Sequence, residues 1–81
     1  MSRARIRVGR DINYRPTDAQ AAAGGGNVDD VWAGRISAVN ADGTVNLHAL
    51  EADGGELALT SIGRGSQKGQ FDLLGVGPQG V

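Results

Sequence analysis

The fold is decided by residues 31–62, VWAGRISAVNADGTVNLHALEADGGELALTSI. Within this stretch apolar residues alternate with polar or small ones, a period of two that is typical of β-strands with one buried face. Two turn-forming groups interrupt the alternation, Asn-Ala-Asp-Gly and Asp-Gly-Gly. In the first, Gly43 can supply the positive φ that a tight hairpin needs. We therefore predict three strands, over residues 31–39, 44–50 and 56–62.

The alternation also assigns the two faces of these strands. The inward set is apolar or small and consists of Trp32, Gly34, Ile36, Ala38, Val45, Leu47, Ala49, Leu57 and Leu59. The outward set is polar and consists of Arg35, Ser37, Asn46 and His48.

Residues 5–14, RIRVGRDINY, alternate in the same way. Ile6 and Val8 share one face, and Ile12 continues the pattern beyond Gly9. This predicts a first strand with a bulge or bend at the glycine.

A long connection then covers residues 17–30, where Thr17 or Asp18 could cap a helical turn. Seven residues make a marginal helix, so we predict a loop. Beyond the central strands, residues 63–70 form a polar, glycine-rich loop, and residues 71–76 form a short last strand.

Five short strands in one chain of 81 residues predict a single all-β domain over residues 1–81, with an arm at 1–5 and a loose tail at 77–81. An open sheet has two exposed edges, and closure removes them. We therefore predict a small five-stranded SH3-like barrel with a basic N-terminal arm and a long first loop. Its expected core is Val8, Ile12, Tyr14, Trp32, Ile36, Val45, Leu47, Leu57, Leu59, Ile62, Phe71 and Leu73.

Charge is uneven along the chain, although the formal total is only −1. The first fifteen residues hold one acid, Asp11, and five arginines, a balance of +4 that leaves −5 for the rest. A basic arm suits contact with an acidic surface, and we predict a partner-binding role for its arginines. They are Arg3, Arg5, Arg7, Arg10 and Arg15. The alternative is that arginines on an early strand only solvate its outer face.

The residues that carry most enzyme chemistry are scarce. Without cysteine, the chain has no disulfide, thiol nucleophile or CxxC zinc site. His48 is the only histidine, and none of the serines lies in a GxSxG pattern. We expect no enzyme, no cofactor and no metal site. No apolar run reaches the roughly 18 residues of a membrane span, and the absence of a signal peptide predicts synthesis in the cytoplasm.

Two glycine-containing segments resemble ligand loops only partly. Counted from Asn40, a calcium loop would end at Glu51, but predicted strand lies between them. Residues 63–69, GRGSQKG, lack the GxxxxGK[ST] pattern of a phosphate-binding loop. Both are therefore interpreted as turns or surface loops.

The stretch WAGRISAVNADGTVNL, residues 32–47, resembles small phage-encoded proteins in which W-A-x-x-[IV]-x-x-V leads into D-G-T-V-x-L. Residues 8–14, VGRDINY, are similar to the V-G-x-x-[IV]-x-Y strand at the start of that group. The ending after Ile62 departs from the group, because it lacks the expected tryptophan.

This resemblance implies an SH3-like virion protein of a tailed bacteriophage, of the capsid decoration (cement) type. It implies the major capsid protein as partner, a homotrimer, and a location on the capsid surface. A head–tail joining or minor tail component is the alternative within the virion. A small nucleic-acid-binding regulator is the alternative from another class, since basic arms bind phosphate. Few aromatic residues are left for base stacking, so nucleic acid is the weaker expectation.

Overall fold

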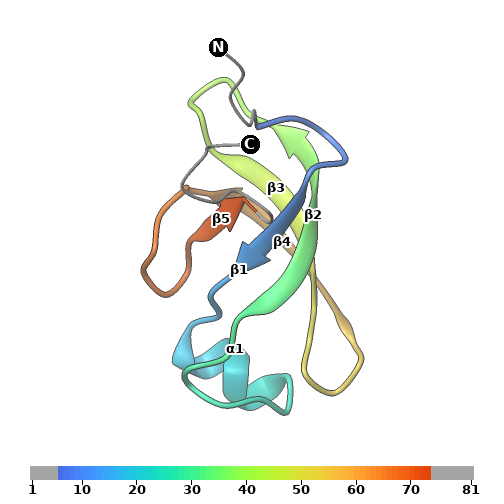
Figure 1. Cartoon of the computed structure of the whole chain (residues 1–81), viewed down its shortest axis with the longest axis vertical. Coiled ribbons are helices and arrows are strands. Elements are labelled where there is room, and N and C mark those ends of the chain that lie inside the picture. Colours follow the sequence, from blue (N-terminus) through green and yellow to red (C-terminus); the bar gives the residue numbers. More distant parts are fainter. Residues whose placement is uncertain (1–5, 74–81) are drawn as a thin grey trace.

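The computed structural model describes residues 6–73, which form a mostly β domain with one short helix (Figure 1). The predicted arm at 1–5 and tail at 77–81 lie outside the described residues. The elements in chain order are β1 (Asp11–Tyr14), α1 (Asp18–Ala23), β2 (Trp32–Val39), β3 (Val45–Leu50), β4 (Glu56–Ile62) and β5 (Phe71–Leu73). The three central strands lie within one residue of their predicted bounds.

All five strands belong to one antiparallel sheet in the order β4-β3-β2-β1-β5. Consecutive strands β1 to β4 are neighbours, whereas β5 returns to pair with β1. In that last pairing Ile12 lies opposite Leu73, and Tyr14 lies opposite Phe71. The two ends of the described chain are thus joined side by side in the sheet.

The sheet is not closed into a barrel, which corrects the predicted architecture. Closure would require β4 and β5 to pair along their length, but within the described residues the sheet order β4-β3-β2-β1-β5 contains no β4–β5 ladder. Among the described residues, the two sides meet only at a parallel bridge between Arg64 and Phe71. Phe71 N donates to Gly63 O (3.1 Å), and Gly65 N donates to Phe71 O (2.9 Å). Both bonds join β5 to residues that follow β4, so the edge of β4 itself is unpaired within residues 6–73.

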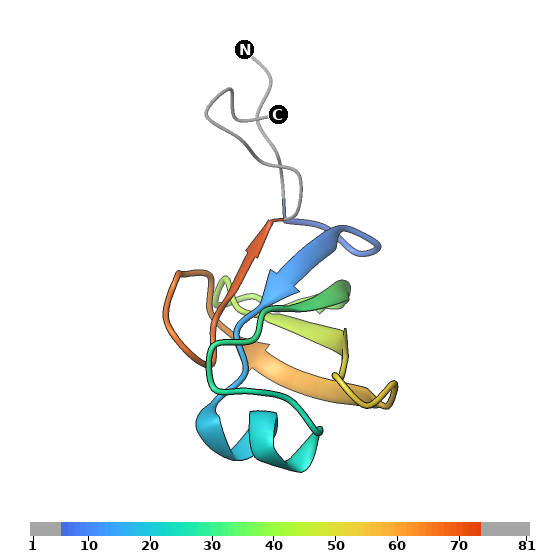
Figure 2. The same ribbon diagram turned by 60° about the horizontal axis from the view of Figure 1, so that its bottom comes forward.

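The sheet is nevertheless strongly curled, and α1 lies below its lower end (Figure 2). The core fills the concave side. It consists of Ile12, Tyr14, Trp32, Ile36, Val45, Leu47, Ala49, Phe71 and Leu73, all with 4% or less of their surface exposed. Four further residues are only partly buried against it, namely Ile6, Leu57, Leu59 and Ile62. Three of these four belong to β4, so the core is least well covered along that strand.

The first strand is shorter than predicted, and Val8 is not a core residue. Residues 7–10 form a turn in which Arg10 N donates to Arg7 O (3.1 Å), and Val8 is 64% exposed. The predicted bend at Gly9 is confirmed. Pairing with β2 continues through this turn, because Gly9 N donates to Ile36 O (2.8 Å).

A helix, α1, occupies the connection for which a loop was predicted. Thr17 is its N-cap and accepts a hydrogen bond from Gln20 N (3.2 Å). Gln20 Oε1 in turn accepts from Thr17 N (3.0 Å), which completes a capping box. Ala21 is buried. The reciprocal cap and this burial stabilise a helix of six residues that would be marginal alone.

The same Gln20 oxygen joins the helix to the core. Tyr14 is 1% exposed, and its hydroxyl donates to Gln20 Oε1 at 2.5 Å. Burial raises the pKa of the Tyr14 phenol above its ordinary value of 10.0, against the smaller opposing effect of this hydrogen bond. A buried hydroxyl needs such a partner, because an unsatisfied one costs about 1–3 kcal/mol.

A bulge twists the far ends of β3 and β4. The register shifts between Val45 and Leu47, and Ser61 adopts a φ of 56°. Asn46 supports this geometry, because its Oδ1 accepts a hydrogen bond from Ser61 N (3.1 Å). The pairing edge of β4 is therefore regular only up to Thr60.

Gly34 lies where β2 has no room for a side chain between its two neighbouring strands. A Cβ placed there would lie 2.4 Å from the backbone oxygen of His48 and 3.0 Å from Ile12 Cδ1. The first atom belongs to the adjacent strand and cannot move without shifting the sheet. Only glycine fits between β1 and β3 at this point.

We expect Gln20→Ala to lower the free energy of unfolding by about 1–3 kcal/mol. The substitution removes the oxygen that accepts from Thr17 N in the capping box, and it leaves the Tyr14 hydroxyl without that acceptor. Chemical denaturation measures the change. In a Tyr14→Phe background the same substitution should cost less, since no hydroxyl is left unpaired. Equal costs in the two backgrounds would show that the hydrogen bond does not couple them.

Gly34→Ala should destabilise the fold by about 1–3 kcal/mol through the clash with His48 O. Gly63→Ala is the matched control, because a Cβ there meets no atom within 4 Å. Thermal unfolding of the two variants should separate them clearly. A Gly34→Ala protein as stable as the control would contradict the close approach.

Candidate functional site: the outer face of the sheet

The convex face of the sheet carries a row of exposed residues that crosses four strands and is polar on the first three. Asp11 of β1 lies opposite Arg35 of β2, Arg35 lies opposite His48 of β3, and His48 lies opposite Ala58 of β4. All four residues are exposed. The outward positions of Arg35 and His48 confirm the sequence prediction.

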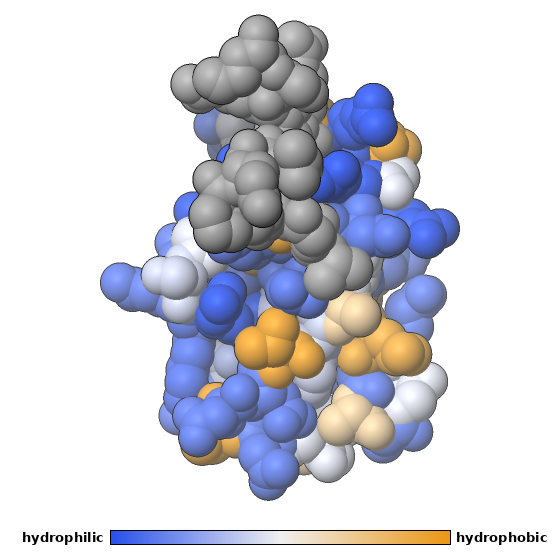
Figure 3. Space-filling view, viewed as in Figure 1, coloured by the Kyte–Doolittle hydropathy of each residue, from blue (hydrophilic) through white to orange (hydrophobic). Residues whose placement is uncertain are grey.

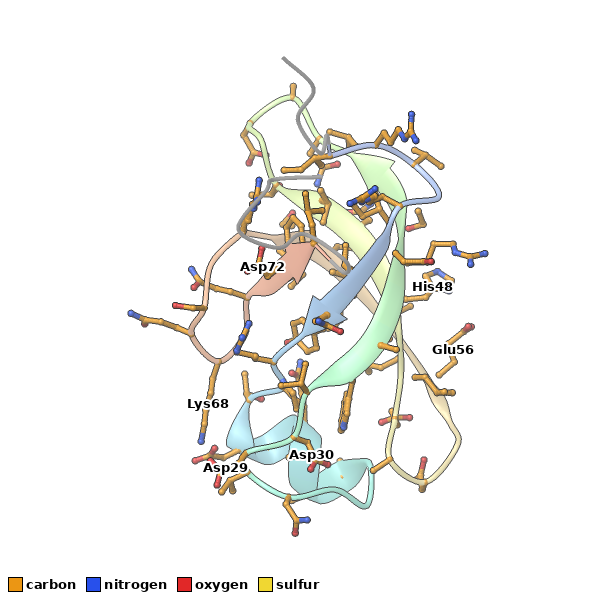
Figure 4. The ribbon with its side chains drawn as sticks, in the orientation of Figure 1. Asp29, Asp30, His48, Glu56, Lys68 and Asp72 are labelled. Carbon is orange, nitrogen blue, oxygen red and sulfur yellow. The ribbon has the colours of Figure 1, made fainter. Side chains whose placement is uncertain are left out.

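One exposed ion pair and one exposed histidine–carboxylate pair occupy this face. Arg35 Nε donates to Asp11 Oδ1 at 3.1 Å. His48 Nδ1 lies 3.3 Å from Glu56 Oε1, and these two side chains project from the same side of the molecule (Figure 4). Because water surrounds them, both pairs contribute little to stability and stay available for contact with another molecule.

Between the pairs lies an open hollow of about 550 Å³. Its lining includes Ala33 and Leu50, and the Leu50 side chain is 57% exposed. The face drawn in Figure 3 carries small apolar groups separated by polar residues. An apolar floor with charged groups around it is the composition of a small interface, with an apolar centre and a polar rim.

Of the arginines predicted to bind a partner, the three within the described residues do not form one patch. Arg3 and Arg5 lie outside the described residues. Arg7 is exposed in the turn before β1, and Arg10 is half-buried at its end. Arg15 follows the other end of β1, a strand roughly 13 Å long. The sequence cluster is therefore divided between two ends of the sheet.

Arg15 lines a second, smaller hollow of about 210 Å³. Its Nη1 is buried and has no hydrogen-bond partner among residues 6–73. Val28 and Val31, which are 51% and 49% exposed, line the same hollow. Asp29 and Lys68 also line it, and they lie close to α1 in Figure 4. Acidic and basic groups balance here, so this hollow has no clear preference for one sign of charge.

The glycine-rich loop between β4 and β5 uses its cations within the chain. Lys68 Nζ contacts Asp18 Oδ1 at the start of α1. Arg64 Nε lies 3.5 Å from Asp72 Oδ1 in β5. These pairs hold the loop against its neighbours, and they compete with any phosphate that would bind the same groups.

The 40–43 segment is a hairpin turn, as predicted. Asp42 Oδ1 accepts hydrogen bonds from the Thr44 hydroxyl (2.6 Å) and from Thr44 N (3.0 Å). These bonds lower the pKa of the exposed Asp42 carboxyl. The oxygen that a calcium ion would need is thus engaged in closing the turn.

In the part of the chain that the structure describes, no group of three or more histidine, aspartate or glutamate residues is placed to hold a metal ion. His48 contacts Glu56, and within residues 6–73 it is hydrogen-bonded to no serine hydroxyl. The described helix is too short and too polar to cross a membrane. Comparisons with protein-family models, with curated proteins and with solved structures found no match.

Sequence reasoning did not identify the hollow on the outer face. Its polar members were assigned outward, but Leu50 was not recognised as an exposed apolar residue. The alternation does predict that Leu50 is outward, because it lies two residues after His48 in the strand and therefore shares its face. Which residues lie beside it depends on the register of three strands.

We expect Arg35→Ala and Asp11→Ala each to change the free energy of unfolding by less than about 1 kcal/mol, because 68% and 54% of the two side chains are exposed. Urea denaturation of both variants provides the measurement. A loss of several kcal/mol would show instead that the pair is part of the folding core and not a free contact surface.

Proposed function

We propose that this chain is a structural binding protein of a tailed bacteriophage, a decoration protein that attaches to the outer capsid surface and stabilises the head. The observation that carries the proposal is the exposed outer face. It combines an apolar floor at Ala33 and Leu50 with the solvent-exposed ion pair of Arg35 with Asp11 and the exposed contact of His48 with Glu56. The resemblance of residues 32–47 to small phage proteins supplies the class of partner.

The physical basis of attachment is a mixed surface. Burial of Leu50, now 57% exposed, would contribute about 1 kcal/mol by the area rule. Arg35 and Glu56 can exchange water for polar groups of the capsid, which gives orientation more than affinity. A site of this size binds weakly alone. Many copies bound to one particle would stabilise the head collectively.

The basic segment at the N-terminus is the second contact in this proposal. Arg7 is exposed, and it follows Arg3 and Arg5 in the sequence. These side chains would bind acidic groups of the capsid through charge-assisted hydrogen bonds. Ile6 packs against the core and Gly9 bonds to β2, so a test must leave residues 6–10 in place.

The nucleic-acid alternative gains little support from the fold. Tyr14, Trp32 and Phe71 are the only aromatic residues of the chain, and all three are at most 4% exposed. None of them offers a face on which a base could stack. Phosphate contact by the arginines remains its sole basis.

Particle binding tests the proposal. Purified capsids of the encoding phage are mixed with the protein, sedimented, and assayed for retained chain. We expect Leu50→Lys to reduce retention at least tenfold while the unfolding temperature stays unchanged, because that side chain is exposed. Val28→Lys is the matched control, since Val28 is 51% exposed away from the outer hollow and should retain normal binding.

The arm has its own variant, Arg3→Gln/Arg5→Gln/Arg7→Gln, which keeps the chain at full length. Reduced retention at low salt, with a shallower loss of retention at high salt than in the wild type, supports the arm contact. Absence of the wild-type protein from capsids, together with salt-dependent binding to duplex DNA, would overturn the proposal in favour of the regulator.

A further inference from the structure

The outer edge of β4 is an unprotected pairing edge. In the described chain β4 pairs only with β3. Natural edge strands are usually blocked by lysine, proline or an inward-pointing charge. From Leu57 to Ile62 the strand has none of these, and its only charged residue is Glu56 at the start. Such an edge is prepared to accept another strand.

Backbone geometry shows which residues offer their hydrogen-bonding groups. Glu51 N donates to Gly55 O (2.7 Å), which fixes that opposite pair as hydrogen-bonded. Because such pairs alternate along an antiparallel ladder, Leu57 and Leu59 direct their backbone groups toward β3. The N–H and C=O groups that point away from the sheet therefore belong to Glu56, Ala58 and Thr60.

This set of three residues has a central member, Ala58, and can therefore pair with the same set of a second copy. A two-fold axis at Ala58 places Ala58 opposite its equivalent and Glu56 opposite Thr60 of the other copy. Each outward-facing pair is then a hydrogen-bonded one, which gives about six new backbone hydrogen bonds. No two like charges face each other across the axis.

The side chains agree with the same register. Leu57 of one copy would lie opposite Leu59 of the other, on the concave side of both sheets. These leucines are only partly buried against the core. Pairing would cover them, so two incompletely covered cores would become continuous. On the convex side the small Ala58 side chains meet without a clash.

We propose that two copies of this chain associate through antiparallel pairing of their β4 edges about a two-fold axis at Ala58. The contact is independent of the proposed capsid function, although it engages the backbone of Glu56, which also lines the outer hollow. It differs from the trimer implied by the phage resemblance, because antiparallel pairing of identical strands requires a two-fold axis.

Light scattering after size exclusion, over a range of protein concentrations, tests the contact. The wild-type chain and Ala58→Ser should have twice the chain mass, since both keep the backbone N–H. Ala58→Pro removes that donor and should be monomeric. Proline is tolerated where an edge N–H points away from the sheet, and an unchanged circular dichroism spectrum and unfolding curve will show that the variant is folded.

Cross-linking locates the axis. The chain has no cysteine, so Ala58→Cys introduces a unique thiol. A short bis-maleimide should join two Ala58→Cys chains efficiently, and should join Ala41→Cys chains poorly, since residue 41 lies in the β2–β3 turn. A monomeric wild-type protein, a threefold mass, or an Ala58→Pro variant that stays dimeric would overturn the pairing. A threefold mass would leave the proposed capsid binding intact.

Discussion

The hydrogen bond from Tyr14 to Gln20 joins the two parts of this small domain. Tyr14 belongs to the concave core, and Gln20 completes the capping box of the helix that covers the lower end of the sheet. One amide oxygen accepts from both the phenol and Thr17 N, so it satisfies the core and the helix start together. With few large side chains in the core, the fold relies on this polar contact to hold the long connection in place.

The strands that follow Val31 could be predicted closely, because alternation and turn residues agree over that whole stretch. Prediction failed where local signals conflict. Val8 fits a strand pattern, but the chain turns at Gly9 before β1 begins. The helix was rejected for its length, although Thr17 and Gln20 form the spacing of a capping box. Closure of the barrel depended on whether β4 and β5 pair with each other, which alternation cannot specify.

The candidate site could be predicted only in part for a related reason. Parity in a strand assigns Arg35 and His48 to the outer face, and the structure agrees. Parity does not say which residues of different strands lie side by side, because bulges shift the register. The hollow around Leu50 is a product of that register. Likewise, Arg7 and Arg10 lie in the turn before β1, and the length of β1 separates them from Arg15.

The left-handed backbone of Ser61 limits how far an edge contact can grow. It ends the regular part of β4 after Thr60, so a neighbouring strand finds three usable positions and no longer template. At the opposite side of the sheet, β5 is short and is already bridged by residues 63–65. Within residues 6–73 the two sides of the sheet therefore offer little template for head-to-tail stacking into a cross-β fibril.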